Sequence, residues 1–77
     1  MRLNELAPGG TGRVKGLQTE GAMRRRLLEL GLVPGTRVRC LGRSPMGDPA
    51  AFEIRGAVIA LRARDSAGVL LEDGLWE

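Results

Sequence analysis

The 77-residue sequence has no histidine and no tyrosine, and it has only one cysteine, one tryptophan and one phenylalanine. The lone Cys40 has no partner for an internal disulfide, and no apolar segment of the kind found in secretory leaders follows Met1. We therefore expect a reducing, cytoplasmic setting. No apolar run reaches the roughly 20 residues that cross a bilayer, so we expect no membrane insertion.

The scarcity of reactive side chains also limits the chemistry. Without histidine, with Cys40 on a predicted core face and without paired carboxylates, no nucleophile and base can be assigned. We predict that the protein is not an enzyme and has no catalytic residues. Asp48 and Glu53 have no further ligands grouped around them, whereas a specific transition-metal site needs several converging ligands. We expect neither a metal site nor a cofactor.

Length and charge narrow the possibilities further. A chain of this size forms one domain, residues 1–77, and buries only roughly 60% of its unfolded surface, so a large enclosed active site is not expected. Residues 1–43 carry nine basic and three acidic side chains, whereas residues 44–77 carry three basic and six acidic ones. The basic half is compatible with nucleic acid, anionic lipid or an acidic protein surface.

One segment has the pattern of an amphipathic helix. Met23, Leu27 and Leu30 fall on one face at 100° per residue, the arrangement of a helix that packs on a core. Thr19 is the expected N-cap, and Glu20 would then lie at the positive end of the helix dipole.

The end of this helix carries a stronger signal than its start. Gly31 at C′ with positive φ would place Leu32 against Leu27, which is a Schellman termination. Residues 33–36, VPGT, then fit a type II turn, because Pro34 presets φ and the following glycine allows a positive φ. A strand is expected to begin directly after this turn.

The other segments are typical of short strands. Leu3–Leu6 predicts one turn that places two leucines on the core. Strands are predicted over residues 11–17, with a bulge at Gly16 that lets Val14 and Leu17 both point inward, over 36–40, as a hairpin over 51–62, and over 68–71. Residues 42–49 are predicted to form an exposed loop, residues 64–67 a short turn or a single helical turn, and the tail from Glu72 is expected to be frayed.

These segments define a fold class. Five short strands with one apolar face each, and one helix between the first two, cannot bury a core as a flat open sheet. We predict a mainly β protein, a small barrel of about five strands, whose helix between the first and second strands closes one end and which leaves few free edges.

The order of the segments resembles the FeoA family, the small cytoplasmic partners of the bacterial ferrous iron transporter FeoB. The resemblance is carried by Leu3 and Leu6 with Pro8-Gly9, by residues 25–36 (RRLLELGLVPGT), by residues 44–49 (SPMGDP), and by Arg55-Gly56 with residues 59–62 (IALR). It implies an SH3-like barrel. Gly68 and Ala57 depart from the family pattern, and Gly68 is expected to weaken the turn before the last strand.

The same barrel is found, by resemblance, at the C-terminal end of metal-dependent repressors of the diphtheria toxin repressor type. Because this chain starts at Met1 directly in the barrel, without a helix-turn-helix before it, we expect the free-standing version.

A partner contact is predicted at the loop tip. A turn needs glycine and proline but not an exposed methionine, whose flexible thioether suits docking on apolar surfaces. We assign Pro45, Met46, Gly47 and Asp48 to this contact, although Met46 could instead fold back over the barrel.

The helix arginines are a second candidate contact. Arg24 and Arg25, with Arg26, fan around the helix, so they could contact the partner or form a solvated face whose stems cover core leucines. An arginine finger would need an exposed tip, which the flanks of a helix do not offer.

We therefore predict a non-enzymatic cytoplasmic accessory protein that binds the cytoplasmic part of FeoB and supports or regulates ferrous iron uptake. The alternatives are a small basic barrel that binds nucleic acid and a free-standing regulatory domain related to that of metal-dependent repressors. Such barrels stack bases on aromatic side chains, and Phe52 is expected inside while Trp76 lies in the tail, so no nucleic-acid partner is expected.

Overall fold

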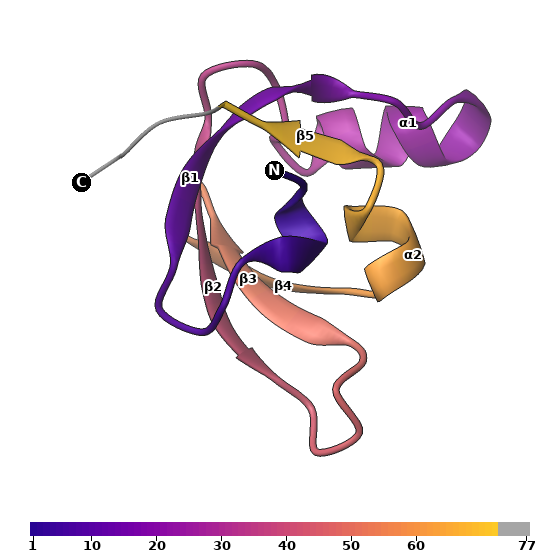
Figure 1. Cartoon of the computed structure of the whole chain (residues 1–77). Coiled ribbons are helices and arrows are strands. Elements are labelled where there is room, and N and C mark those ends of the chain that lie inside the picture. The colour runs from indigo at the N-terminus through magenta and orange to yellow at the C-terminus, as the bar shows by residue number, and fades with distance from the viewer. Residues whose placement is uncertain (73–77) are drawn as a thin grey trace.

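The computed structural model describes residues 1–72. The elements, in chain order, are η1 (Leu3–Glu5), β1 (Thr11–Leu17), α1 (Gly21–Glu29), β2 (Arg37–Arg43), β3 (Ala50–Ile54), β4 (Ala57–Leu61), α2 (Ala63–Ser66) and β5 (Val69–Leu71). The five strands form one antiparallel sheet in the order β4-β3-β2-β1-β5 (Figure 1). The predicted mainly β fold, with one main helix between the first two strands, is confirmed.

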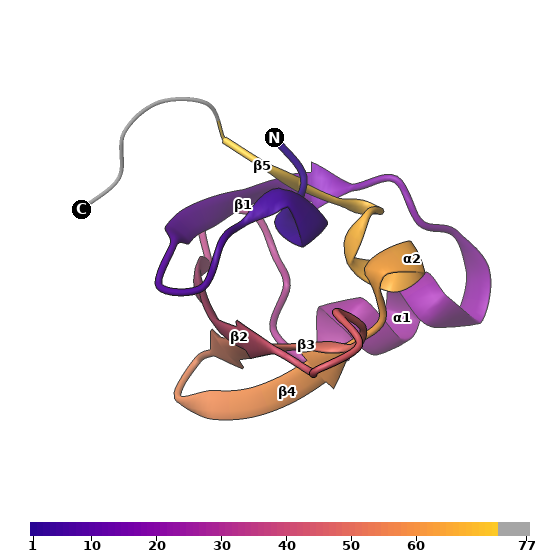
Figure 2. The same ribbon diagram turned by 60° about the horizontal axis from the view of Figure 1, so that its bottom comes forward.

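The sheet curls so that β1 and β5 lie across the core from β3 and β4, and the helices fill the side between them (Figure 2). The two end strands, β4 and β5, do not pair with each other. The outer edge of β5 is covered by the start of the chain. The Leu71 N–H donates to the Met1 carbonyl at 2.8 Å, and Arg2 forms an isolated antiparallel β-bridge with Leu70. Within residues 1–72 one strand edge thus remains open, that of β4, in agreement with the few free edges that were predicted.

The core receives side chains from every strand and from α1. Phe52 of β3 and Val14 of β1 are fully buried, and so is Leu27, which anchors the helix. On β2, Val38 and Cys40 are buried while the arginines between them are exposed, which confirms the predicted alternation. Burial of such side chains contributes about 1.5–3 kcal/mol each and is the main source of stability in a barrel of this size.

The predicted start of α1 is wrong. The helix begins at Gly21 with Glu20 as N-cap, and no side chain donates to or accepts from the first turn as a cap. The Thr19 side chain is used elsewhere: it lies so close to Gly68 that a Cβ on this glycine would collide with the Thr19 hydroxyl. Thr19 therefore packs the segment that follows β1 against the last turn before β5 and is not available to cap the helix.

The predicted end of α1 is confirmed in detail. The Leu32 N–H donates to the Leu27 carbonyl at 3.1 Å and the Gly31 N–H to the Leu28 carbonyl at 3.0 Å, the bond pair of a Schellman motif. Gly31 has φ +103°. The turn that follows is also as expected, since the Thr36 N–H donates to the Val33 carbonyl at 3.0 Å.

The strands match the predictions to within one residue, apart from one boundary. The register of β1 shifts between Val14 and Gly16, which confirms the bulge. Strand β2, however, continues through Gly42 to Arg43, so the predicted loop begins two residues later than expected. A second register shift, between Cys40 and Gly42, keeps β2 paired with β3. Gly42 is visible in the sequence, but its pairing with Ala51 of β3 could not be predicted from it.

Two predictions concern the C-terminal part. The turn before the last strand forms the short helix α2 even though Gly68 follows it. The Glu72 N–H donates to the Arg13 carbonyl at 2.9 Å, so the predicted fraying from Glu72 is wrong at that residue. The rest of the predicted tail, with Trp76, lies outside the described residues.

Candidate protein-binding surface

The loop between β2 and β3 projects from the barrel and carries the most exposed large apolar side chain of residues 1–72. Met46 is 91% exposed, so it does not fold back over the core. The Gly47 N–H donates to the Ser44 carbonyl at 2.7 Å and the Ser44 N–H to the Pro49 carbonyl at 3.0 Å, which closes the loop at its base. Gly47 has φ +87°, which allows the tight turn. Backbone bonds thus hold a flexible thioether out in solvent.

Asp48, unlike Met46, contacts another element of the fold through its side chain. Its Oδ1 accepts a hydrogen bond from the Ala63 N–H at 2.8 Å, at the first residue of α2. The carboxylate thereby satisfies one of the free N–H groups at a helix start. Asp48 ties the loop to α2, and its assignment to a partner contact stays a prediction.

The predicted helix arginines lie elsewhere on the barrel. Arg24 Nη1 donates to the Leu17 carbonyl at 3.4 Å and so links α1 to β1. The Arg25 side chain is exposed and makes no hydrogen bond or ion pair with another residue in the part of the chain that is described. Figure 1 places α1 far from the loop over residues 44–49, with α2 and the β3–β4 hairpin between them. The two predicted contacts therefore do not form one surface.

A shallow groove at the base of the loop was not predicted. It has a volume of about 380 Å³. The groove is open to solvent on the outer face of the sheet, and its walls come from β2, the loop base, β3 and β4: Leu41, Gly42, Arg43, Ser44, Pro49, Ala50, Ala51 and Ala60.

The lining of this groove is mostly apolar. Leu41 is 41% exposed. The Ser44 Oγ is buried and has no hydrogen-bond partner among the described residues. The groove forms because the side chains that lie next to each other on neighbouring strands are small. This row of small residues can be recognised only once the strand register is known.

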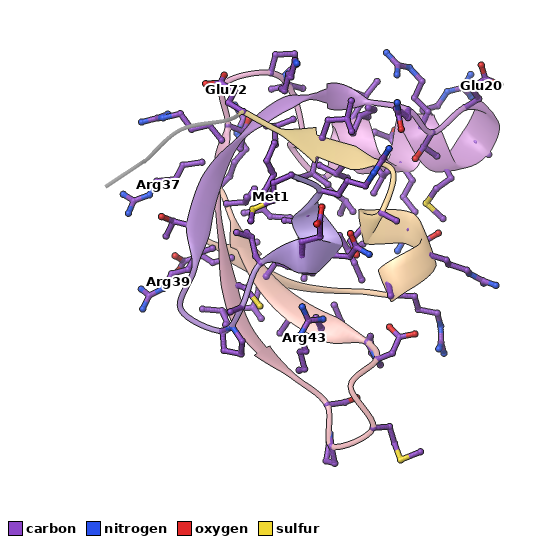
Figure 3. The ribbon with its side chains drawn as sticks, viewed as in Figure 1. Met1, Glu20, Arg37, Arg39, Arg43 and Glu72 are labelled. Carbon is purple, nitrogen blue, oxygen red and sulfur yellow. The ribbon has the colours of Figure 1, made fainter. Side chains whose placement is uncertain are left out.

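Arg43, the last residue of β2, lines the groove and also binds the start of the chain. Its guanidinium donates to the carbonyls of Asn4 and Leu6, both at 2.9 Å, and so fastens η1 to the end of β2. Figure 3 shows Arg43 across the lower part of the barrel, and Arg37 and Arg39 projecting outward from β2 on the side away from α1.

Arg37 and Arg39 border a second hollow, which was not predicted from the sequence. Arg37 and Arg39, with Arg55 and Glu53 from the neighbouring hairpin, border a depression of about 330 Å³. No two of these side chains are joined by an ion pair within residues 1–72. The excess of positive charge makes this face suitable for an acidic surface.

The described part of the chain contains neither a cluster of metal ligands nor a helix that could span a membrane. No group of three or more His, Cys, Asp or Glu side chains lies close enough to hold a metal ion in residues 1–72. Over the same residues, no helix has the length and apolarity needed to cross a bilayer. Cys40 is fully buried in the core.

A small curled five-stranded barrel with an exposed apolar loop and groove is the architecture of an SH3-like domain. A solved FeoA from Stenotrophomonas maltophilia, described as a prokaryotic SH3 domain protein complexed with zinc, superimposes with a TM-score of 0.84. It is 32% identical to this chain, and the match covers 94% of this chain and 89% of the other. The SH3-like fold is thus shown.

The model of the FeoA domain matches residues 1–73, and the chain belongs to the FeoA domain family. It is 32% identical over 72 residues to a protein of Porphyromonas gingivalis strain W83 named Fe(2+) transport protein A/Fe(2+) transporter FeoB fusion protein. That match covers 94% of this chain but only 8% of the length of the fusion protein. The family links the chain to ferrous iron transport.

A manganese-dependent transcriptional repressor, solved with manganese, shares the fold with a TM-score of 0.83 and 22% identity. The match covers 94% of this chain and 35% of the repressor. At this identity the likeness concerns the fold alone.

Proposed function

We propose that this protein is a non-enzymatic, cytoplasmic accessory protein that binds the cytoplasmic part of a FeoB-type ferrous iron transporter and supports or regulates uptake. The observation that carries the proposal is the likeness to one segment of a fused FeoA and FeoB protein. Two domains that are joined in one chain in one organism are expected to meet when they occur on separate chains. Membership of the FeoA domain family supports the same partner.

The contact surface in this proposal centres on the loop over residues 45–48. Met46 is 91% exposed, and the apolar groove begins at the loop base. Burying a methionine side chain in an interface is worth about 1.5–3 kcal/mol, which corresponds to roughly 10–150-fold in Kd. Pro45 and Gly47 shape the loop, and Arg24 and Arg25 of α1 are proposed as a separate, secondary contact.

The test is binding of the intact protein to the intact transporter in detergent, followed by ferrous iron uptake in cells. We expect Met46→Asp to weaken binding at least about tenfold, because the aspartate would have to be buried without a partner. Met46→Leu keeps an apolar side chain of similar size and serves as the matched control. Ala22→Asp, on the exposed start of α1, controls for the change in net charge.

Each result has a separate meaning. If the wild-type protein does not bind the transporter, the proposed function is wrong. If the wild type binds and Met46→Asp binds equally well with an unchanged urea unfolding curve, the loop is removed from the interface while the function stands.

One observation favours nucleic acid as a second candidate partner. Arg37, Arg39 and Arg55 border one hollow, and none of the three is ion-paired to an acidic side chain within residues 1–72, as in a phosphate-binding face. Against it, Phe52 is fully buried, and no other aromatic residue occurs in residues 1–72 to stack on bases. Binding to RNA or DNA that weakens steeply with salt, and is lost in Arg37→Glu, would support this candidate.

A further inference from the structure

The outer edge of β4 is the one strand edge of the sheet, within the described residues, that nothing covers. β4 ends the strand order, and its residues make no backbone hydrogen bond outside the pairing with β3. Proteins usually protect such an edge with lysine, proline or a bulge. β4 (Ala57–Leu61) contains none of these: its five residues are apolar, and its register with β3 is continuous.

The hairpin geometry shows which backbone groups of β4 point outward. Arg55 and Gly56 both have positive φ, so the connection is a two-residue turn of the I′ kind, flanked by Ile54 opposite Ala57. This flanking pair is hydrogen-bonded through the turn, and bonded and non-bonded pairs then alternate along an antiparallel ladder.

Val58 and Ala60 are the non-bonded positions in this ladder. Their N–H and C=O groups therefore point away from β3, and no other described residue binds them. Four backbone hydrogen-bonding groups are thus available along the edge. Both residues are also exposed, and Val58 is 69% exposed.

The outer face beside this edge can receive side chains from an added strand. Ala60 lies opposite Ala51, and Ala51 lies opposite Gly42 on β2, so the row across the sheet consists of small residues. The groove of about 380 Å³ lies over this row. A large apolar side chain placed next to Ala60 would extend across the row toward Leu41.

Charge at the two ends of β4 distinguishes the possible occupants. Arg55 precedes the strand and Arg62 follows it; both are exposed, and neither is ion-paired within residues 1–72. Suppose that β4 paired antiparallel with β4 of a second copy, with Val58 of one copy opposite Ala60 of the other. Arg62 of one copy would then lie beside Arg55 of the other at both ends of the paired strands. Such like-charge contacts oppose self-pairing, whereas acidic residues flanking an apolar segment would be attracted.

We propose that the outer edge of β4 is a strand-addition site for an extended, apolar segment of a partner protein that carries acidic residues at its ends. The segment pairs with the backbone of Val58 and Ala60, and one of its large apolar side chains occupies the groove. That the partner is the transporter rests on the function proposed above. The edge itself, with its free backbone groups and flanking charges, does not depend on that identity.

The first experiment tests the edge without the transporter. Amide hydrogen exchange of the intact, ¹⁵N-labelled protein is followed with a synthetic peptide, Glu-Val-Thr-Leu-Thr-Val-Glu. A peptide of the same sequence with N-methylated alternate amides is the matched control. We expect exchange at Val58 and Ala60 to slow at least about tenfold with the first peptide only, while Ile59, already bonded to β3, stays unchanged.

The second experiment uses the intact transporter. Val58→Pro removes the outward N–H and leaves the bonds to β3 in place, as proline on an edge strand allows. We expect this variant to bind the transporter at least about tenfold more weakly than the wild type, and Val58→Thr to bind within about twofold. Urea unfolding of each variant shows whether the barrel is intact.

The outcomes separate the two proposals. Slowed exchange with the peptide but no binding of the wild type to the transporter would overturn the proposed function and leave the edge site standing. Transporter binding that is unaffected by Val58→Pro, with no slowing by the peptide, would overturn the edge site. Slowing at Val58 and Ala60 that depends on protein concentration alone would identify a second copy as the occupant and would also overturn it.

Discussion

Gly31 is a residue at which the fold is sensitive to a single added methyl group. It has φ +103° and is buried at the end of α1, where it makes the Schellman termination. An added Cβ would lie 2.5 Å from Cδ of Arg55, whose stem crosses the helix end. Gly31→Ala therefore introduces two separate costs, one in the backbone and one in a neighbouring side chain.

The two costs can be given magnitudes. A non-glycine residue with left-handed φ costs about 1–2 kcal/mol. Displacing Arg55 from its rotamer costs about 0.5–1.5 kcal/mol more. Because a domain of this size has a stability of only about 3–5 kcal/mol, we expect Gly31→Ala to remove about half of it. Each kcal/mol corresponds to a fall in Tm of about 4–8 °C.

The chain offers a matched control for the backbone cost. Gly35 has φ +91°, but a Cβ there would have no heavy atom within 4 Å. Gly35→Ala should therefore show the backbone cost alone, and the difference between the two variants measures the contact with Arg55. Urea unfolding followed by circular dichroism gives both free energies of unfolding. Equal losses in the two variants, or no recovery when Arg55→Ala is combined with Gly31→Ala, would refute this reasoning.

Two further predictions concern the contacts that hold the last third of the chain. Gly68→Ala should destabilise the barrel by about 1–3 kcal/mol, because the new methyl group would collide with the Thr19 hydroxyl, and Thr19→Ala should restore most of the loss in urea unfolding. Asp48→Ala should cost about 1 kcal/mol, because the Ala63 N–H loses its acceptor, while Asp48→Asn keeps an acceptor and should cost less. An Asp48→Ala variant as stable as the wild type would show that the bond contributes nothing.

Local signals explain why much of the fold could be predicted. Gly31 and Leu32 end a helix in a way that depends on neighbours in sequence, and the backbone bonds form as expected. The alternation of Val38 and Cys40 with arginines gave the correct face of β2. Proline and glycine in residues 33–36 gave the turn for the same reason, since each residue restricts or frees its own φ.

The errors arose where distant residues decide the outcome. Thr19 is a good N-cap by composition, but its side chain packs against Gly68, which is 49 positions away in the sequence. The end of β2 depends on Arg43, whose guanidinium binds carbonyls near the start of the chain. No local pattern contains these long-range contacts.

The candidate surface was predicted only in part. The loop with Met46 could be found because an exposed methionine is not needed for a turn. The groove and the edge of β4 could not be found, because both depend on strand order and register. Val58 looks like an ordinary strand residue until its position at the end of the sheet is known. The sequence thus predicted a projecting loop but not the sheet beside it.

The pairing of Met1 and Arg2 with β5 has a practical consequence for engineering. Since the Met1 carbonyl accepts from the Leu71 N–H, the first and last described segments emerge side by side. A circular permutant that joins them through a short linker should keep the barrel, and a host protein could carry the domain as an insertion in a surface loop. A purification tag placed there would leave the opposite border of the sheet, at β4, accessible for capture experiments.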